Sequence, residues 1–272
     1  MNEPDRKDLN KLYHCAEYAT GIYTYLRERE RVTAAKYGYM KNQPELNEKM
    51  RAVLMDWICA VSEKFTLLQE TTFLTANLID RFLECEKITK GKLQLVGVAA
   101  LVIASKYEEI YPPDIKDFIH VTEKTVSKDE ILKMESQILN KLKYELSGPS
   151  ILRFIERYSK LVSTPPDQLF NLALYFGELQ LIDYNLLKHP PSLVAAGSVY
   201  LAQRILKGSS TWPEIVKSQS GHNEEEVKQC AKDILSMLQA QDKAGFQATK
   251  KKFSQKKYME VAKSKIDYSM SI

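Results

Sequence analysis

The chain contains two copies of one unit, and this repeat is the strongest constraint on its fold. Residues 95–107 read LVGVAALVIASKY, and residues 193–205 read LVAAGSVYLAQRI, at an offset of 98. Residues 131–142 (ILKMESQILNKL) match residues 227–238 (VKQCAKDILSML) at an offset of 96. Self-similarity at a nearly constant offset is typical of a duplicated supersecondary unit. Length, small residues and the lack of alternation favour helices over strands, so an all-α chain is expected.

Local signals divide the chain into segments. Pro112-Pro113 stops one helix, and Ser127 with Glu130 forms a capping box that begins another. Gly148-Pro149 separates the two copies. An additional amphipathic helix is expected over residues 8–30. The predicted domains are 1–46 (N-terminal helix and linker), 47–147 (first repeat), 148–242 (second repeat) and 243–272 (a short basic C-terminal tail).

Charge is distributed unevenly. After residue 242 there are eight lysines and two acidic residues, so residues 1–242 carry −2 of the net +4. A slightly acidic body is a poor match for nucleic-acid phosphates. The longest apolar run is about half of the roughly 20 residues that a membrane span needs, and no signal peptide is visible, so a soluble intracellular protein is expected. The basic tail fits a solvated end, with nuclear localisation as an alternative.

No catalytic, metal-binding or cofactor-binding motif stands out. The four histidines are scattered, there is no P-loop, and there is no nucleophile elbow. Glu108 and Glu109 are adjacent carboxylates, but neighbouring helical residues point in different directions. These observations favour a regulatory or binding protein without a cofactor over an enzyme.

One position separates the repeats. Glu135 lies on an otherwise apolar helical stripe, and its counterpart in the second copy is Ala231. A carboxylate on such a stripe needs a partner, and Lys106 is the obvious candidate. Taken alone, the pair fits a structural ion pair and a docking site equally well.

A second stripe lies on the preceding helix. Met50, Val53, Leu54 and Trp57 have the i, i+3, i+4, i+7 spacing of one helical face. Taken alone, this spacing is more typical of core. Met and Trp at the edge of such a stripe can also form a shallow docking patch.

Several segments resemble the cyclin box of A- and B-type cyclins. They are GYMKNQPE (38–45), MRAVLMDW (50–57), IDRFL (79–83), KGKLQLVGVAAL (90–101) and ASKYEEIYPPD (104–114). The resemblance extends from about Tyr18 through the second repeat and mixes A-type with B-type features. It implies two tandem five-helix cyclin folds preceded by an N-terminal helix.

The resemblance also implies a partner, the catalytic subunit of a cyclin-dependent protein kinase, which the chain would activate in the cell cycle. Lys106 and Glu135 would bind the backbone of the kinase's regulatory helix. The residues implied to surround this pair are Tyr107, Glu108, Glu109, Ile110, Leu139, Tyr144, Leu146, Tyr18 and Ile22.

Two further sets follow from the resemblance. Arg51 and Asp80 match a structural ion pair between the first two helices of the box. A substrate-docking patch for Arg-x-Leu motifs of substrates or inhibitors would comprise Met50, Val53, Leu54, Trp57, Leu93 and Gln94. Ala60 stands where related cyclins often carry Glu or Gln, so the acidic partner for the motif's arginine is missing.

Three alternatives remain at this point. One is a nucleic-acid-binding protein of the same fold, like transcription initiation factor B, which would need a basic face. The others are an enzyme with an unfamiliar helical site and a scaffold that does not activate a kinase. The cyclin resemblance implies a protein of the nucleus and cytoplasm, without membrane or nucleic-acid partners.

Overall fold

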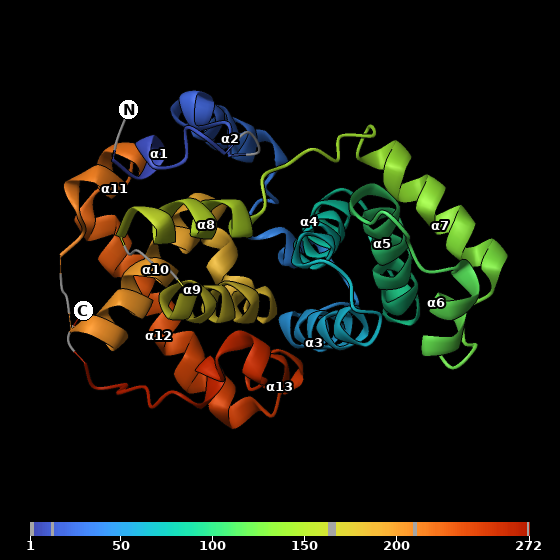
Figure 1. The fold of residues 1–272 in the computed structure, drawn as a ribbon. Helices are drawn as coiled ribbons and strands as arrows, with labels where there is room; N and C mark the ends of the chain where they lie inside the picture. The colour runs from blue at the N-terminus through green and yellow to red at the C-terminus, as the bar shows by residue number, and fades with distance from the viewer. Residues whose placement is uncertain (1–2, 12–13, 163–166, 209–210, 271) are drawn as a thin grey trace.

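The computed structural model describes residues 3–11, 14–162, 167–208, 211–270 and 272, and these residues contain helices and no strand (Figure 1). The expected all-helical fold with two tandem repeats is confirmed. The repeats lie side by side, with the N-terminal segment over the second repeat and the C-terminal segment beneath both.

The first repeat is built around one apolar helix. This central helix, α5, packs against α3, α4 and α7, and its residues Val96 and Ala100 are fully buried. The small Gly97 allows the Leu54 side chain to approach, since a Cβ at Gly97 would lie 2.7 Å from Leu54 Cδ1. The five helices are α3 (Glu48–Lys64), α4 (Gln69–Cys85), α5 (Leu93–Glu108), α6 (Ile115–Val121) and α7 (Lys128–Lys141).

The second repeat has the same order of helices. Its central helix, α10, packs against α8, α9 and α12, and Ala195 and Ala196 are fully buried. The five helices are α8 (Ile151–Val162), α9 (Asp167–Leu179), α10 (Pro191–Lys207), α11 (Glu214–Ser220) and α12 (Glu224–Ala244). The last helix continues two residues past the predicted boundary at residue 242.

The local signals explain several helix ends. Asn47 accepts a hydrogen bond from the Met50 N–H and caps α3, and Ser127 with Glu130 forms the expected capping box of α7. Helix α5 ends at Glu108, ahead of Pro112-Pro113. The short helices η3 (Tyr39–Asn42), η4 (Lys90–Lys92), η5 (Gln180–Ile182) and η6 (Tyr184–Lys188) lie in the connections.

The N-terminal helix differs from the prediction. Instead of one helix over residues 8–30, the chain forms α1 (Glu3–Arg6), turns, η2 (Ala16–Tyr18) and α2 (Ala19–Thr33). Cys15, which precedes η2, has φ 45°, a left-handed conformation that a continuous helix excludes. The amphipathic pattern is present, but the helix starts eleven residues later than expected.

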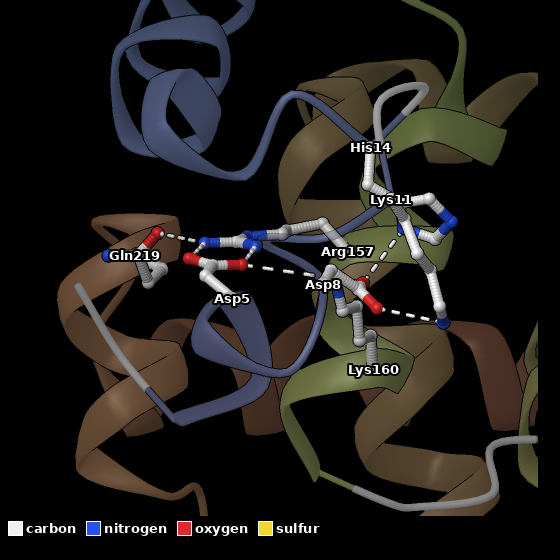
Figure 2. Close-up of polar contacts among 7 residues, drawn as sticks. All are labelled: Asp5, Asp8, Lys11, His14, Arg157, Lys160 and Gln219. Carbon is white, nitrogen blue, oxygen red and sulfur yellow. Dashed lines mark hydrogen bonds and ion pairs between the residues drawn. The ribbon is translucent and has the colours of Figure 1, made fainter.

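Salt bridges to the second repeat explain this difference (Figure 2). Asp5 accepts two hydrogen bonds from Arg157, at 2.5 and 2.9 Å, and Arg157 Nη2 also donates to Gln219 Oε1. Asp8 pairs with Lys160, which lies on α8 like Arg157. Lys11 and His14 lie 2.9 and 2.8 Å from the Asp8 carboxylate. Both aspartates are buried. These contacts to α8 and α11 hold the segment before α2 in a non-helical path.

The basic C-terminal segment is packed against both repeats, so the interpretation as a solvated end is wrong for residues 248–263. It forms α13 (Ala248–Phe253), η7 (Lys256–Tyr258) and η8 (Val261–Lys263). Phe253 and Val261 are buried, and Lys252 Nζ lies 2.5 Å from Glu178 Oε2 of α9 inside the protein.

The same segment also contacts the first repeat. The Ala248 N–H donates to Asp56 Oδ1 of α3 at 3.1 Å, and Lys257 Nζ lies 3.0 Å from Glu63 Oε1. Figure 1 shows α13 beside α3. Two lysines of the tail, Lys252 and Lys257, therefore pair with carboxylates of the repeats.

A buried arginine connects the two repeats. Arg51 of α3 donates from Nε and Nη2 to the two carboxylate oxygens of Asp80 at 2.6 and 2.7 Å, and from Nη1 to the carbonyl of Leu181 at 2.8 Å. Tyr39 OH donates to the same carboxylate at 2.7 Å. Burial opposes the charged guanidinium, but the Asp80 carboxylate raises the pKa of Arg51 above its usual range. The predicted Arg51–Asp80 ion pair is present, and it also reaches the second repeat.

We predict that Asp8→Asn destabilises the protein in a pH-dependent way. The hydrogen bond from Lys160 lowers the pKa of Asp8 below its usual range, although burial opposes this effect; Lys11 and His14 contribute in the same direction as Lys160. A carboxylate with a depressed pKa stabilises the fold above its unfolded pKa of about 3.9, and the contribution is lost as pH falls below that value. The difference in free energy of unfolding between wild type and variant should therefore be present at pH 5 and shrink towards pH 2.

Urea denaturation across this pH range measures the difference. Glu17→Gln, which neutralises an exposed acid of η2, is the control and should show little difference at any pH. A wild-type advantage that does not change between pH 5 and pH 2 would contradict the assignment.

We predict that Arg51→Ala lowers the free energy of unfolding by about 3–5 kcal/mol, because it leaves the Asp80 carboxylate buried without its main partner. Lys87→Ala, on an exposed connection, should change it by less than about 0.5 kcal/mol. Chemical denaturation at pH 7 measures both. Equal stabilities for the two variants would show that Arg51 does not hold the repeats together.

Candidate functional site

An ion pair at the surface of the first repeat is the centre of the site. Lys106 Nζ, near the end of α5, lies 2.6 Å from Glu135 Oε1 in the middle of α7. The Lys106 side chain is 53% exposed and the Glu135 side chain 12%. The stripe around Glu135 is otherwise core, since Ile131 and Ile138 are fully buried. The pair therefore lies at the rim of the core and is accessible to a partner.

Both side chains keep further hydrogen-bonding capacity. A lysine ammonium has three N–H donors, and a carboxylate has about four acceptor positions. Within the described residues, the pair is joined by one hydrogen bond. A main-chain segment that offers both carbonyl and N–H groups could bind this pair.

Exposed apolar side chains follow both members of the pair along the chain. Tyr107 and Ile110 lie at the end of α5, and Ile110 is 85% exposed. Tyr144 follows α7 and is also exposed. Leu139 and Leu146 are half-buried and pack against the core. Large exposed apolar residues gathered around a polar pair are typical of a protein-binding surface.

The backbone at Tyr144 is held in an unusual conformation. Lys143 and Tyr144 have φ values of 53° and 58°, the left-handed region that side chains with a Cβ rarely adopt. The Tyr144 N–H donates to the Leu139 carbonyl at 2.9 Å. This turn presents the exposed tyrosine ring beside α7, and local strain of this kind often marks functional positions.

The two adjacent glutamates have separate surroundings. Glu109 accepts hydrogen bonds from the Leu68 N–H at 2.7 Å and from Thr71 Oγ1 at 2.5 Å, so it ties the end of α5 to the start of α4. Glu108 faces a cleft between the repeats with Glu70, where burial and then the Glu70 carboxylate raise its pKa. The structure thus gives Glu109 a supporting contact within the first repeat.

Two further predicted residues lie on the N-terminal segment. Tyr18 ends η2, Ile22 lies in α2, and both are exposed. Helix α2 is joined to the segment after α7 by an ion pair between Arg29 and Glu145. Ile22 therefore lies on a helix that is anchored next to Tyr144, and Tyr18 directly precedes that helix.

The second predicted patch forms a groove between α3 and α5, called the α3–α5 groove below. It has a volume of about 500 Å³, and all six predicted residues line it. Val53 is exposed and Leu54 and Leu93 are buried, so the groove has an accessible rim and a packed floor. The sequence interpretation missed three lining residues, Asn47, Lys49 and Lys90.

The second repeat lacks the equivalent pair. Arg204, at the position of Lys106, donates to the Gly208 carbonyl at the end of its own helix. Ala231, at the position of Glu135, is fully buried. The helices are duplicated, but the exposed pair occurs in the first repeat.

A polar cluster that the sequence did not indicate positions α2. Glu30 accepts hydrogen bonds from the Ser192 N–H and hydroxyl at 2.8 and 2.6 Å, and His222 Nε2 lies 2.8 Å from the same hydroxyl. Arg27 donates to the Ser220 carbonyl at 3.0 Å. Ser192 is fully buried. The cluster fixes α2 on α10 and on the α11–α12 connection.

Neither a metal site nor a membrane span is found in the described part of the chain. No group of three or more His, Cys, Asp or Glu residues there could hold a metal ion. None of its helices is both long enough and apolar enough to cross a bilayer.

Comparison with known proteins assigns a family to this fold. The model of the cyclin N-terminal domain matches residues 21–147, and that of the cyclin C-terminal domain matches residues 149–267. The chain is 39% identical to G2/mitotic-specific cyclin-B of Dictyostelium discoideum over 90% of its own length and 56% of the relative's. It is 40% identical to cyclin-A2 of Gallus gallus over 90% of its length and 62% of the relative's.

A third relative is covered more fully. The chain is 37% identical to G2/mitotic-specific cyclin-B of Hydra vulgaris over 96% of its own length and 72% of the relative's. In the first two comparisons the chain spans only about six-tenths of the relative. A- and B-type names thus occur together, in agreement with the mixed features of the sequence.

The fold is also found among solved structures. A viral cyclin from herpesvirus saimiri superimposes with a TM-score of 0.69 at 22% identity, over 79% of this chain and 96% of that one. A chain of the yeast RNA Pol II CTD kinase CTDK-1 complex gives a TM-score of 0.59 at 14% identity, over 78% of this chain and 70% of that one. The duplicated helical repeat, the two domain models and these relatives agree, and the chain belongs to the cyclin family.

Proposed function

We propose that the chain is a regulatory subunit that binds and activates a cyclin-dependent Ser/Thr protein kinase in cell-cycle control. The observation that carries the proposal is the accessible Lys106–Glu135 pair, with exposed Tyr107, Ile110 and Tyr144 around it. In this proposal the chain performs no catalysis and uses no cofactor.

The mechanism is allosteric. A kinase of this class needs an ion pair between its active-site lysine and a glutamate of its regulatory helix. Lys106 and Glu135 bind the backbone of that helix, while the surrounding apolar side chains exclude water from the contact. The cyclin thereby shifts the kinase population towards the active arrangement without taking part in the chemistry.

The rigidity of the two repeats supports this mechanism. A partner can be shifted towards one conformation only by a surface with differential affinity for its states. Helix α5 is held in the centre of the first repeat, and α2 is tied to the second repeat through Glu30 and Ser192. Tyr18, Ile22 and the central pair are thus presented in a fixed arrangement.

The proposal extends to substrate recruitment and location. The α3–α5 groove docks short motifs of substrates or inhibitors; the family resemblance implies Arg-x-Leu motifs. The slightly acidic body argues against a nucleic-acid partner. Activity in the nucleus and cytoplasm is part of the same proposal, and fractionation of the source cells tests it.

We predict that Lys106→Ala weakens kinase binding by about 2 kcal/mol, or about 30-fold in Kd, because it leaves Glu135 unpaired in the contact. The free energy of unfolding should change by less than about 1 kcal/mol, since the lysine is half exposed. Calorimetry with a monomeric cyclin-dependent kinase gives the affinity, and histone phosphorylation gives the activation.

The matched control is Arg204→Ala, at the equivalent position of the second repeat, which should bind and activate like wild type. Failure of wild type to raise histone phosphorylation with any cyclin-dependent kinase of the source cell would defeat the proposal. If Lys106→Ala and Arg204→Ala weakened kinase binding equally, the Lys106–Glu135 pair would have no specific role in that binding.

We predict that Trp57→Ala raises KM roughly tenfold for a protein substrate that docks in the groove, which corresponds to about 1.4 kcal/mol of lost apolar contact. The KM for a short peptide that carries only the phosphorylation site should stay unchanged. Steady-state kinetics with both substrates measure the difference, and Leu9→Ala, which removes an exposed leucine elsewhere, is the control. An equal rise for both substrates would place the effect in the kinase and not in docking.

A further inference from the structure

Charge is distributed unevenly along the α3–α5 groove. Its floor is apolar, and Lys49 and Lys90 line it beside Asn47, where α3 begins. Both lysines are exposed. At the opposite end lies Trp57, and one turn further along α3 the exposed Ala60 contributes only a methyl group. One end of the groove is therefore basic and the other is neutral.

The charged residues that line the groove are both lysines. None of the described residues that line it is acidic. One carboxylate lies beside Lys90: Glu45 accepts a hydrogen bond from the Lys90 backbone N–H at 3.2 Å. Glu48 lines a different pocket, on the side of α3 that faces Ile182 and Met237 of the second repeat, and Lys49 lines both that pocket and the α3–α5 groove.

We propose that the α3–α5 groove selects peptide segments that carry an aspartate or glutamate next to two apolar anchors, in place of an arginine. This inference rests on the proposed docking role of the groove. The ammonium groups of Lys49 and Lys90 bind the carboxylate of the peptide, and Ala60 provides no acceptor for a guanidinium. Opposite charges of this kind set specificity more than affinity.

The geometry gives the spacing of the motif. Lys49 and Val53 are four residues apart on one helix, about 6 Å along its axis. An extended peptide covers that distance in about two residues. The span from Lys49 to Trp57, about 12 Å, takes about four. The motif therefore has two apolar anchors separated by one residue, and an acid two positions beyond the anchor nearest Lys49.

Fluorescence anisotropy with the full chain tests the proposal. The labelled ten-residue peptides all contain Leu-x-Leu. Each carries Glu, Ala, Arg or phosphoserine either two positions before the first leucine or two positions after the second. In about 50 mM salt the Glu peptide of one direction should bind about fivefold tighter than its Ala counterpart, and the Arg peptide more weakly than both. Raising the salt to about 0.5 M should bring the three affinities together, because exposed charges are screened.

Two charge-reversed variants separate local from overall electrostatics. Lys49→Glu with Lys90→Glu should reverse the order, so that the Arg peptide binds tightest. Lys232→Glu with Lys256→Glu, which changes the net charge equally on the second repeat and the C-terminal segment, should leave the order unchanged. Trp57→Ala should weaken all of the peptides alike.

Several outcomes would overturn the inference. The Arg peptide binding tightest to wild type, or equal binding of the Glu and Ala peptides, would remove the acidic preference and leave docking in the groove intact. A gain for phosphoserine without a gain for Glu would show that the groove reads phosphorylation. Binding of none of the peptides would also remove the docking role, whereas kinase activation is decided separately by Lys106→Ala.

Discussion

A buried guanidinium–carboxylate pair is the interaction on which the rest of the structure depends. Arg51 binds Asp80 through two hydrogen bonds and, in the same cluster, the Leu181 carbonyl of the second repeat. Buried charges are tolerated only when their hydrogen bonds are satisfied. The pair therefore requires α3, α4 and the second repeat to keep one relative orientation. Helix α3 carries the groove and α4 supports α5, so both functional surfaces inherit this orientation.

The two repeats show how one fold separates structural from binding roles. Both use a small-residue central helix, in which Ala100 and Ala195 are fully buried. At the rim, the first repeat exposes Lys106 and Glu135, whereas the second has an arginine bound to its own helix end and a buried alanine. The second repeat instead supplies anchorage: α8 and α10 hold the N-terminal segment through Arg157 and Ser192. In the proposed function, the first copy binds the partner and the second copy supports the first.

Signals that act locally were readable from the sequence. The capping box at Ser127, the proline stop after α5 and the repeat itself predict the helices and their order, because each depends on residues a few positions apart. Glu135 could be singled out since the repeats provide an internal comparison. The start of α2 was predicted wrongly because Lys160, 152 residues away, holds Asp8 in a non-helical path. The packed tail was missed for the same reason, since it is held by the contact of Lys252 with Glu178, which is distant in the sequence. Nothing in the local charge pattern of Lys49 and Lys90 indicated that these two lysines share a groove.

The long-range contacts at both ends have a consequence for the order of assembly. Each repeat condenses from helices close in sequence, which is fast, whereas contacts between distant residues close slowly. Asp5 cannot meet Arg157 until the second repeat has left the ribosome, and residues 248–263 emerge later still to bridge α3 and α9. A nascent chain that has completed only its first repeat already carries Lys106 and Glu135, and Arg29 of α2 can pair with Glu145, but the contacts of α2 with Ser192 and Ser220 cannot yet form. Translation therefore delays the full anchoring of α2, and with it the proposed kinase-binding surface, until both halves have been made.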